Sequence, residues 1–252
     1  MKTRTLSRQH HASHDLGYPN LVVAGCSYTD NNHSEYVVAW PYMLRDLCSF
    51  DRVVDCSLGG AGNAHIARSV VTALELDPTL TPADTLVVVM LSGYDRDDYI
   101  VTPDAIRPGY TDFVYEYTPG CCAGITCETQ QHSNMLVDAM SIKRGQSRRT
   151  QALQQYINIV TFKRYLEARG FRHVITEFSQ AGTRRDNNFD IAEYLEPPMA
   201  DRFNAIARQL QPSLGDMAPE SECADGYHPA PEHHLAWCQQ VLIPAVLALV
   251  DP

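Results

Sequence analysis

The fold is decided by the residues LVVAGCSYTD, Leu21–Asp30, in which an apolar run ends at a glycine. An apolar run bounded by a turn residue is typical of a buried strand. A strand that stops at Gly-x-Ser presents the serine hydroxyl at the carboxyl end of a sheet, where α/β proteins place their sites. Ser27 is therefore a candidate nucleophile that needs a neighbouring base. A serine that only caps a helix or closes a turn is the alternative.

Outward from this stretch, apolar runs alternate with segments of helical spacing. Strands are predicted at Leu21–Gly25, Arg52–Ser57, Thr85–Leu91 and Arg172–Phe178. Helices are predicted at Glu35–Cys48, Ala64–Leu76, Thr150–Arg169, Met199–Leu210 and Ala230–Val250, the last broken or kinked at Pro244. The run Thr85–Leu91 is apolar throughout, as a central parallel strand covered on both faces should be. The alternation predicts an α/β fold with a mainly parallel sheet wound on both faces.

The length of 252 residues favours one sizeable α/β domain. We expect a flexible N-terminal tail at 1–19, because this stretch is polar and lacks an apolar core. The single domain then spans 20–252. An insertion is expected at about 97–146, a stretch rich in Tyr, Pro, Gly and Cys without a sustained helical period. It either covers a pocket or decorates the periphery.

Charge and composition exclude several classes of protein. The formal net charge of −10 would repel a phosphate backbone, so nucleic acid is a poor partner. We find no segment apolar enough for a membrane span and no secretory signal, which predicts a cytoplasmic protein whose eight cysteines are mostly reduced. The spacing of Cys121, Cys122, Cys127 and His132 fits no strong zinc pattern, so neither a metal nor an organic cofactor is expected.

A candidate base lies near the C-terminus, in the stretch DGYHP at Asp225–Pro229. The Asp225 carboxylate can accept the Nδ1 proton of His228, which leaves Nε2 free to act as base toward a hydroxyl. A surface turn with an aspartate N-cap is the alternative. His233 and His234 fall inside the predicted helix without a partner carboxylate, so we interpret them as solvated or packing residues.

Donors for an oxyanion could come from two further loops. Glycines after the second strand, Gly59 and Gly60, let backbone N–H groups approach a ligand, and Asn63 could add a side-chain donor. A phosphate-binding loop is disfavoured, because the turn lacks the Lys-Ser/Thr ending of a P-loop. Asp95 and Arg96 follow the third strand and are expected at the same sheet edge; a structural salt bridge between them is the alternative.

These blocks, in this order, resemble the SGNH/GDSL hydrolase superfamily, most closely the branch whose first block reads Gly-Cys-Ser. The resemblance implies a flavodoxin-like three-layer α/β/α sandwich and esterase-type chemistry. It implies that Ser27 is the nucleophile, His228 the general base and Asp225 its orienter. Gly59 or Gly60 would match the oxyanion glycine of the second block.

The sequence departs from the family pattern in two places. Cys26 replaces the usual aspartate of block one, and Asp95 stands where block three normally offers an oxyanion-binding Asn. An ionised carboxylate can only accept hydrogen bonds, so Asn63 or Arg96 supplies the missing donor, or the hole is weaker. One lost donor costs ~10²–10³ in rate. Cys26 is a rival nucleophile; the block-one match and the order of the triad favour Ser27.

The sequence therefore predicts a serine ester hydrolase, an esterase or carbohydrate O-deacetylase, acting on a small acyl ester or an O-acetylated carbohydrate. Two alternatives remain open. One is a catalytically impaired module that binds a glycan or a protein, and the other is an acyltransferase. The sequence does not indicate an oligomeric state.

Overall fold

The computed structural model describes residues 14–30, 39–59, 61–94, 97–100, 114–117, 147–178, 190–218 and 228–250. The sheet comprises β1 (Asn20–Ala24), β2 (Arg52–Asp55), β3 (Thr85–Leu91) and β6 (Arg172–Glu177). All its pairings are parallel, in the order β2-β1-β3-β6. This is the strand order of flavodoxin-like folds.

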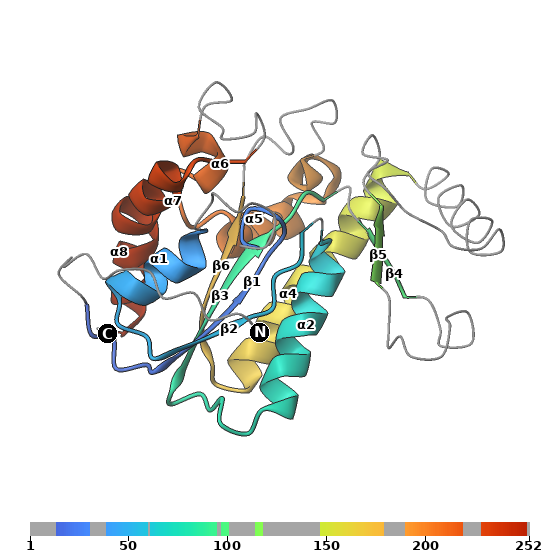
Figure 1. The fold of residues 1–252 in the computed structure, drawn as a ribbon. Helices are drawn as coiled ribbons and strands as arrows, with labels where there is room; N and C mark the ends of the chain where they lie inside the picture. Colours follow the sequence, from blue (N-terminus) through green and yellow to red (C-terminus); the bar gives the residue numbers. More distant parts are fainter. Residues whose placement is uncertain are drawn as a thin grey trace, which may run out of the picture.

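Helices cover both faces of the sheet, which gives three layers (Figure 1). One face is covered by α2 (Asn63–Leu76), α4 (Arg148–Ala168) and α5 (Pro197–Ala207). The other is covered by α1 (Trp40–Leu47), α7 (Pro231–Trp237) and α8 (Ile243–Val250). The predicted α/β/α sandwich with a parallel sheet is thus confirmed.

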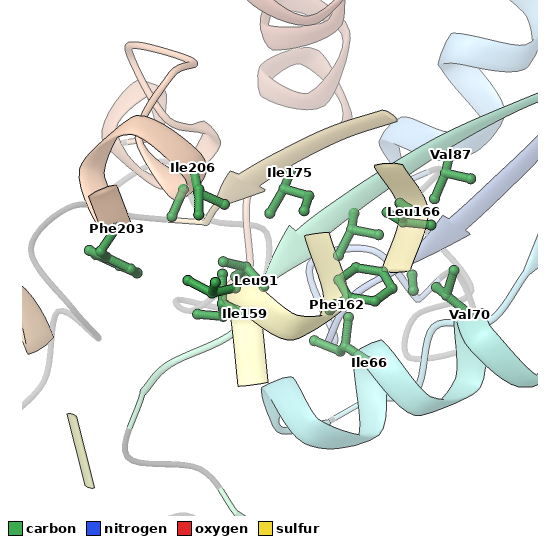
Figure 2. Packing of buried hydrophobic residues seen from close by; sticks show 14 of the residues in the cluster. Ile66, Val70, Val87, Leu91, Ile159, Phe162, Leu166, Ile175, Phe203 and Ile206 are labelled. Carbon is green, nitrogen blue, oxygen red and sulfur yellow. The ribbon is translucent and has the colours of Figure 1, made fainter. Parts of the chain in front are cut away.

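Strand β3 lies at the centre of the core, between β1 and β6, and all of its residues are buried. Alternate side chains point to opposite faces of a strand, so Leu91 packs with one cluster and Met90 with the other. In the first cluster, Ile66 of α2 and Phe162 of α4 pack over the sheet, and Phe203 of α5 lies near its edge (Figure 2). The covered faces explain why the strand reads as one uninterrupted apolar run.

The C-terminal helical region is interrupted, as predicted, but the interruption is a π-helical turn just before Pro244. Between α7 and α8 lies η4 (Cys238–Leu242), one turn of π-helix. The Ile243 N–H donates to the Cys238 carbonyl at the end of this turn. Pro244 follows and has no N–H to donate, so the wider turn lies where the regular ladder would lose a bond.

Two short elements between β6 and α7 were not predicted. They are η2 (Ile191–Tyr194), a 3₁₀ turn, and α6 (Leu214–Met217). Helix α6 begins with a capping box, in which the Ser213 hydroxyl accepts from the Asp216 N–H and the Asp216 carboxylate accepts from the Ser213 N–H. The signal was therefore present in the sequence but too short to carry helical periodicity.

The stretch predicted as an insertion, 97–146, contains β4 (Asp97–Ile100) and β5 (Val114–Tyr117). These strands pair antiparallel, with Asp97 opposite Tyr117, in a sheet separate from the main one. The rest of that stretch and residues 1–13 lie outside the described residues, so the tail, the role of the insertion and the single-domain organisation stay predictions. In the part of the chain described, no helix has both the length and the apolar character that crossing a membrane requires.

Candidate active site

The first three sequence blocks meet at the carboxyl edge of the sheet. Gly25 follows β1, and its carbonyl accepts from the N–H of Leu58 in the loop after β2 (3.1 Å). The Leu91 carbonyl at the end of β3 accepts from the Phe178 N–H just after β6 (3.2 Å). The parallel strands therefore bring the loops after β1 and β2, and the chain ends of β3 and β6, side by side.

Ser27 lies in a single helical turn directly after β1. The N–H groups of Thr29 and Asp30 both donate to the Cys26 carbonyl, at 2.8 and 2.9 Å. In the described part of the chain the Ser27 N–H has no acceptor, as expected of the first amides of a helical turn. Ser27 is partly exposed, whereas the Cys26 side chain is only 1% exposed. This difference favours Ser27 over Cys26 as a group that a substrate can reach.

Gly25 is required by the tightness of this turn. A Cβ atom at position 25 would lie 2.7 Å from the Cβ of Thr29 and would also collide with its Oγ1. Thr29 cannot move away, because it is fully buried and its Oγ1 accepts from the indole Nε1 of Trp40 in α1 (3.2 Å). The nucleophile turn is thereby anchored to the next helix.

His228 reaches this turn from the far end of the chain. Its ring packs against the ring of Tyr28, with centroids 5.2 Å apart and an interplanar angle of 50°. Tyr28 also stacks on Phe178, with centroids 3.9 Å apart. The predicted base is thus brought beside the residue that follows Ser27. Asp225 lies outside the described residues, so its orienting role stays a prediction.

A second histidine, His234 in α7, lies near enough to His228 to be affected by its charge, and it was not predicted to have a role in the site. It is 1% exposed, and its Nδ1 accepts the backbone N–H of Trp40 (3.3 Å). It is also hydrogen-bonded to the backbone of Pro229, which has only a carbonyl to offer. Burial, and then the charges of His228 and His233, lower the pKa of His234 to about 4. The sequence could not reveal this bond, since Trp40 is 194 positions away.

The amide of Gly59 is already engaged. Its N–H donates to Oδ2 of Asp30 (2.9 Å), a carboxylate that is 9% exposed. This N–H is therefore not available to bind an oxyanion in this structure. Gly60, the other glycine that the sequence offered, lies outside the described residues.

The side chain of Asn63 is also engaged. Its Nδ2 donates to the Ser92 carbonyl and to Oε1 of Gln155, both at 3.2 Å, and its Oδ1 accepts the Ser92 N–H at 2.8 Å. Asn63 is 2% exposed. Both amide protons are thus used to fix the start of block three, and the geometry favours this structural role over direct oxyanion binding. Asp95 and Arg96 lie outside the described residues.

A buried charge network adjoins block three. The Glu177 carboxylate at the end of β6 accepts from the Tyr94 hydroxyl (2.7 Å) and from Nε of Arg208 (2.8 Å). Arg208 also pairs with Asp190 at 2.8 Å. Burial raises the pKa of Glu177 to about 7, against the opposing bonds from Tyr94 and Arg208. The network fixes Tyr94, and it was not predicted, because its members lie far apart in the sequence.

Among the residues described, no group of three or more His, Cys, Asp or Glu side chains is arranged to hold a metal. The cysteines described, Cys26, Cys48, Cys56 and Cys238, are free thiols. Burial raises the pKa of Cys48 to about 12 and that of Cys56 to about 11, so both are protonated at neutral pH. Cys121, Cys122, Cys127 and His132 lie outside the described residues.

Comparisons with known proteins find likeness in structure but not in sequence. No protein-family model matches the sequence, and no curated protein matches it. Among solved structures, a proposed acylhydrolase from Bacteroides fragilis is 15% identical, with a TM-score of 0.47 over 95% of this chain and 91% of that one. TesA is 16% identical, with a TM-score of 0.43 over 92% of this chain and 95% of that one. Protein YXIM_BACsu from Bacillus subtilis is 13% identical, with a TM-score of 0.35 over 92% of this chain and 55% of that one.

Proposed function

We propose that this chain is a serine hydrolase of the SGNH type that cleaves ester bonds through an acyl-enzyme on Ser27. The observation that carries the proposal is the packing of the His228 ring on Tyr28, the residue after Ser27. A serine becomes a useful nucleophile only beside a base, and a histidine is the commonest one. Ser27 is partly exposed at the carboxyl edge of the sheet, where a substrate can reach it.

In the proposed reaction, Oγ of Ser27 attacks the ester carbonyl carbon while Nε2 of His228 takes its proton. The tetrahedral intermediate collapses, and the same proton passes to the departing alcohol. Water then attacks the acyl-enzyme while His228 takes a proton from it. The second tetrahedral intermediate collapses, His228 returns that proton to Oγ of Ser27, and the acid leaves. Asp225 would accept the Nδ1 proton of His228 and hold the ring in the required tautomer. No cofactor is needed.

The oxyanion hole of this enzyme is expected to be sparse. The Ser27 N–H has no acceptor among the described residues and can serve as one donor. Gly59 and Asn63 have their N–H groups engaged, which leaves Gly60 and Arg96 as the further candidates. Because one missing donor costs ~10²–10³ in rate, we expect turnover well below that of an enzyme with a complete hole.

The proposed substrate is a small acyl ester or an O-acetyl group on a carbohydrate, met in the cytoplasm. Acyl transfer to a sugar hydroxyl uses the same acyl-enzyme, and competition between water and excess sugar would reveal it. A catalytically impaired binding module is the second candidate. It is favoured by the engaged Gly59 and Asn63 donors, and labelling with a fluorophosphonate separates it from an enzyme.

The decisive experiment measures hydrolysis of p-nitrophenyl esters from acetate to octanoate, together with fluorophosphonate labelling. We expect turnover and labelling in the wild type, and loss of both in Ser27→Ala. Cys26→Ala should retain both. Ser69→Ala is the matched control, since this serine lies in α2 and its hydroxyl donates to the Ile66 carbonyl (3.0 Å). Hydrolysis that survives in Ser27→Ala, or a wild type that neither turns over nor labels, would overturn the proposal.

A further inference from the structure

Trp40 joins the nucleophile turn to the C-terminal helices. Its indole Nε1 donates to Thr29, two residues after Ser27, and its backbone N–H donates to Nδ1 of His234. Its ring packs edge-on against Trp237 of α7, with centroids 5.9 Å apart. Trp40 and Trp237 are both fully buried. Neither tryptophan can shift without disturbing the core, so the contact between Trp40 and Trp237 holds α1 and α7 in a fixed relative position.

His234 makes a bond at each end of its ring. The Trp40 N–H is one of the amides at the start of α1 that have no partner within the helix, and the N-cap residue Ala39 provides no side-chain cap. Nδ1 of His234 supplies that acceptor from a different helix. An imidazole that accepts at Nδ1 carries its proton on Nε2, so the bond to Pro229 runs from Nε2–H to the carbonyl.

We propose that His234 is a positioning residue that sets the place of His228 relative to Ser27. This inference rests on the proposed function. The path is continuous: the Ser27 turn is bonded through Thr29 to Trp40, Trp40 to His234, and His234 to the carbonyl of Pro229, which is covalently joined to His228. The two bonds made by Trp40, to Thr29 (3.2 Å) and to His234 (3.3 Å), join buried groups, and the ring of His234 interacts with the backbone carbonyl of Pro229.

The chemistry of the position selects a neutral imidazole. The Trp40 end requires an acceptor and the Pro229 end a donor, and the two lie at opposite ends of one side chain. A lysine or an arginine offers only donors, and an aliphatic side chain offers neither group. A His228 ring displaced by about 1 Å would cost on the order of 10²-fold in rate, because proton transfer depends on the Ser27–His228 geometry.

The test compares His234→Leu, His234→Gln and His234→Asn. The leucine variant loses both bonds, so we expect its kcat and its fluorophosphonate labelling rate to fall about 10–100-fold with KM little changed. The Gln amide can take the place of Nε2 and donate to Pro229, and should restore most of the loss. The Asn carbonyl can take the place of Nδ1 and accept only from Trp40, so it should restore less. Equal rates in the leucine variant and the wild type would overturn the inference.

The control and a second readout separate positioning from stability. Cys238→Ala also removes a buried group beside Trp40, whose carbonyl accepts from the thiol (3.6 Å), but leaves both His234 bonds in place. It should keep the wild-type rate at a lowered Tm; a loss equal to that of His234→Leu would overturn the inference. The ring ¹⁵N and ¹H signals of His228 should shift in His234→Leu and not in Cys238→Ala. Unshifted signals would overturn the inference whether or not the protein hydrolyses esters.

Discussion

At the residue scale, the nucleophile turn depends on the absence of a side chain at Gly25. We expect Gly25→Ala to reduce fluorophosphonate labelling of Ser27 at least tenfold, because the added Cβ would lie 2.7 Å from the Cβ of Thr29 and displace the turn. Labelling kinetics measure the effect. Thr29→Gly in the same chain removes the colliding atoms and should restore part of the rate. A Gly25→Ala variant that labels like the wild type would show that the turn is not constrained in this way.

The sequence predicted the roles of single residues unevenly. Ser27 and His228 could be singled out because each stands in a short block whose order along the chain is informative. The roles of Gly59 and Asn63 could not be foreseen in full, since a sequence identifies a donor but not whether its protons are already used. His234 could not be distinguished from any other helical histidine, because its partners Trp40 and Pro229 are set by the packing of α7 on α1.

At the element scale, Arg208 of the segment after α5 ties together two carboxylates from other elements. Its guanidinium pairs with Glu177, which is 2% exposed, and with Asp190, which is 29% exposed. We expect Arg208→Leu to lower the free energy of unfolding by about 3 kcal/mol. This is the lower end of the range of about 3–5 kcal/mol that is typical when one partner of a buried ion pair is removed. The lower end applies because a Glu177 carboxyl with a pKa of about 7 can take up a proton once its partner is gone.

Urea denaturation of the variant and of a matched control measures this cost. Arg149→Leu removes an arginine whose partner, Glu196, is on the surface; the two side chains are 64% and 61% exposed. Exposed pairs contribute less than about 1 kcal/mol, so this control should unfold nearly as the wild type does. If both variants lost the same small amount, the buried network would not be stabilising.

Elements with strong periodicity were the most predictable. Thr85–Leu91 was predicted with the bounds that β3 has, because a strand covered on both faces is a nearly continuous apolar run, here from Leu86 to Leu91. The helix predicted at Met199–Leu210 instead starts at Pro197 and ends at Ala207, since two prolines suit the first helical turn. The π turn before Pro244 was not predicted, because the proline indicates where the helix is interrupted but not how the backbone accommodates the interruption.

At the scale of the whole molecule, the two cores on either face of the sheet meet at the candidate site. Strand β6 ends with Glu177, whose partners Tyr94 and Arg208 lie on the face covered by α2, α4 and α5. Phe178 follows and packs with the second core, where it stacks on Tyr28 beside His228. Successive residues of an extended chain point to opposite faces. Glu177 therefore contacts Tyr94 of block three on one face, while Phe178 contacts Tyr28, the neighbour of the proposed base, on the other.

The stability of the whole fold should fall in mild acid because of His234. Its folded-state pKa of about 4 lies below the unfolded value of 6.5, so between these values only the unfolded chain holds the proton. Unfolding is therefore favoured increasingly as the pH falls from about 6.5 to about 4. For this group the free energy of unfolding should drop by roughly 2 kcal/mol between pH 7 and pH 5.

Urea titrations of the wild type and His234→Gln at pH 7 and pH 5 isolate this contribution. Glutamine does not titrate, so the loss on acidification should be smaller in the variant by about that amount, even if its stability at pH 7 is lower. Cys238→Ala, a change in η4 just after α7 that removes no histidine, should lose as much as the wild type. Equal losses in the wild type and His234→Gln would mean that His234 is protonated in the fold, and that its bond from the Trp40 N–H does not hold α1 to α7.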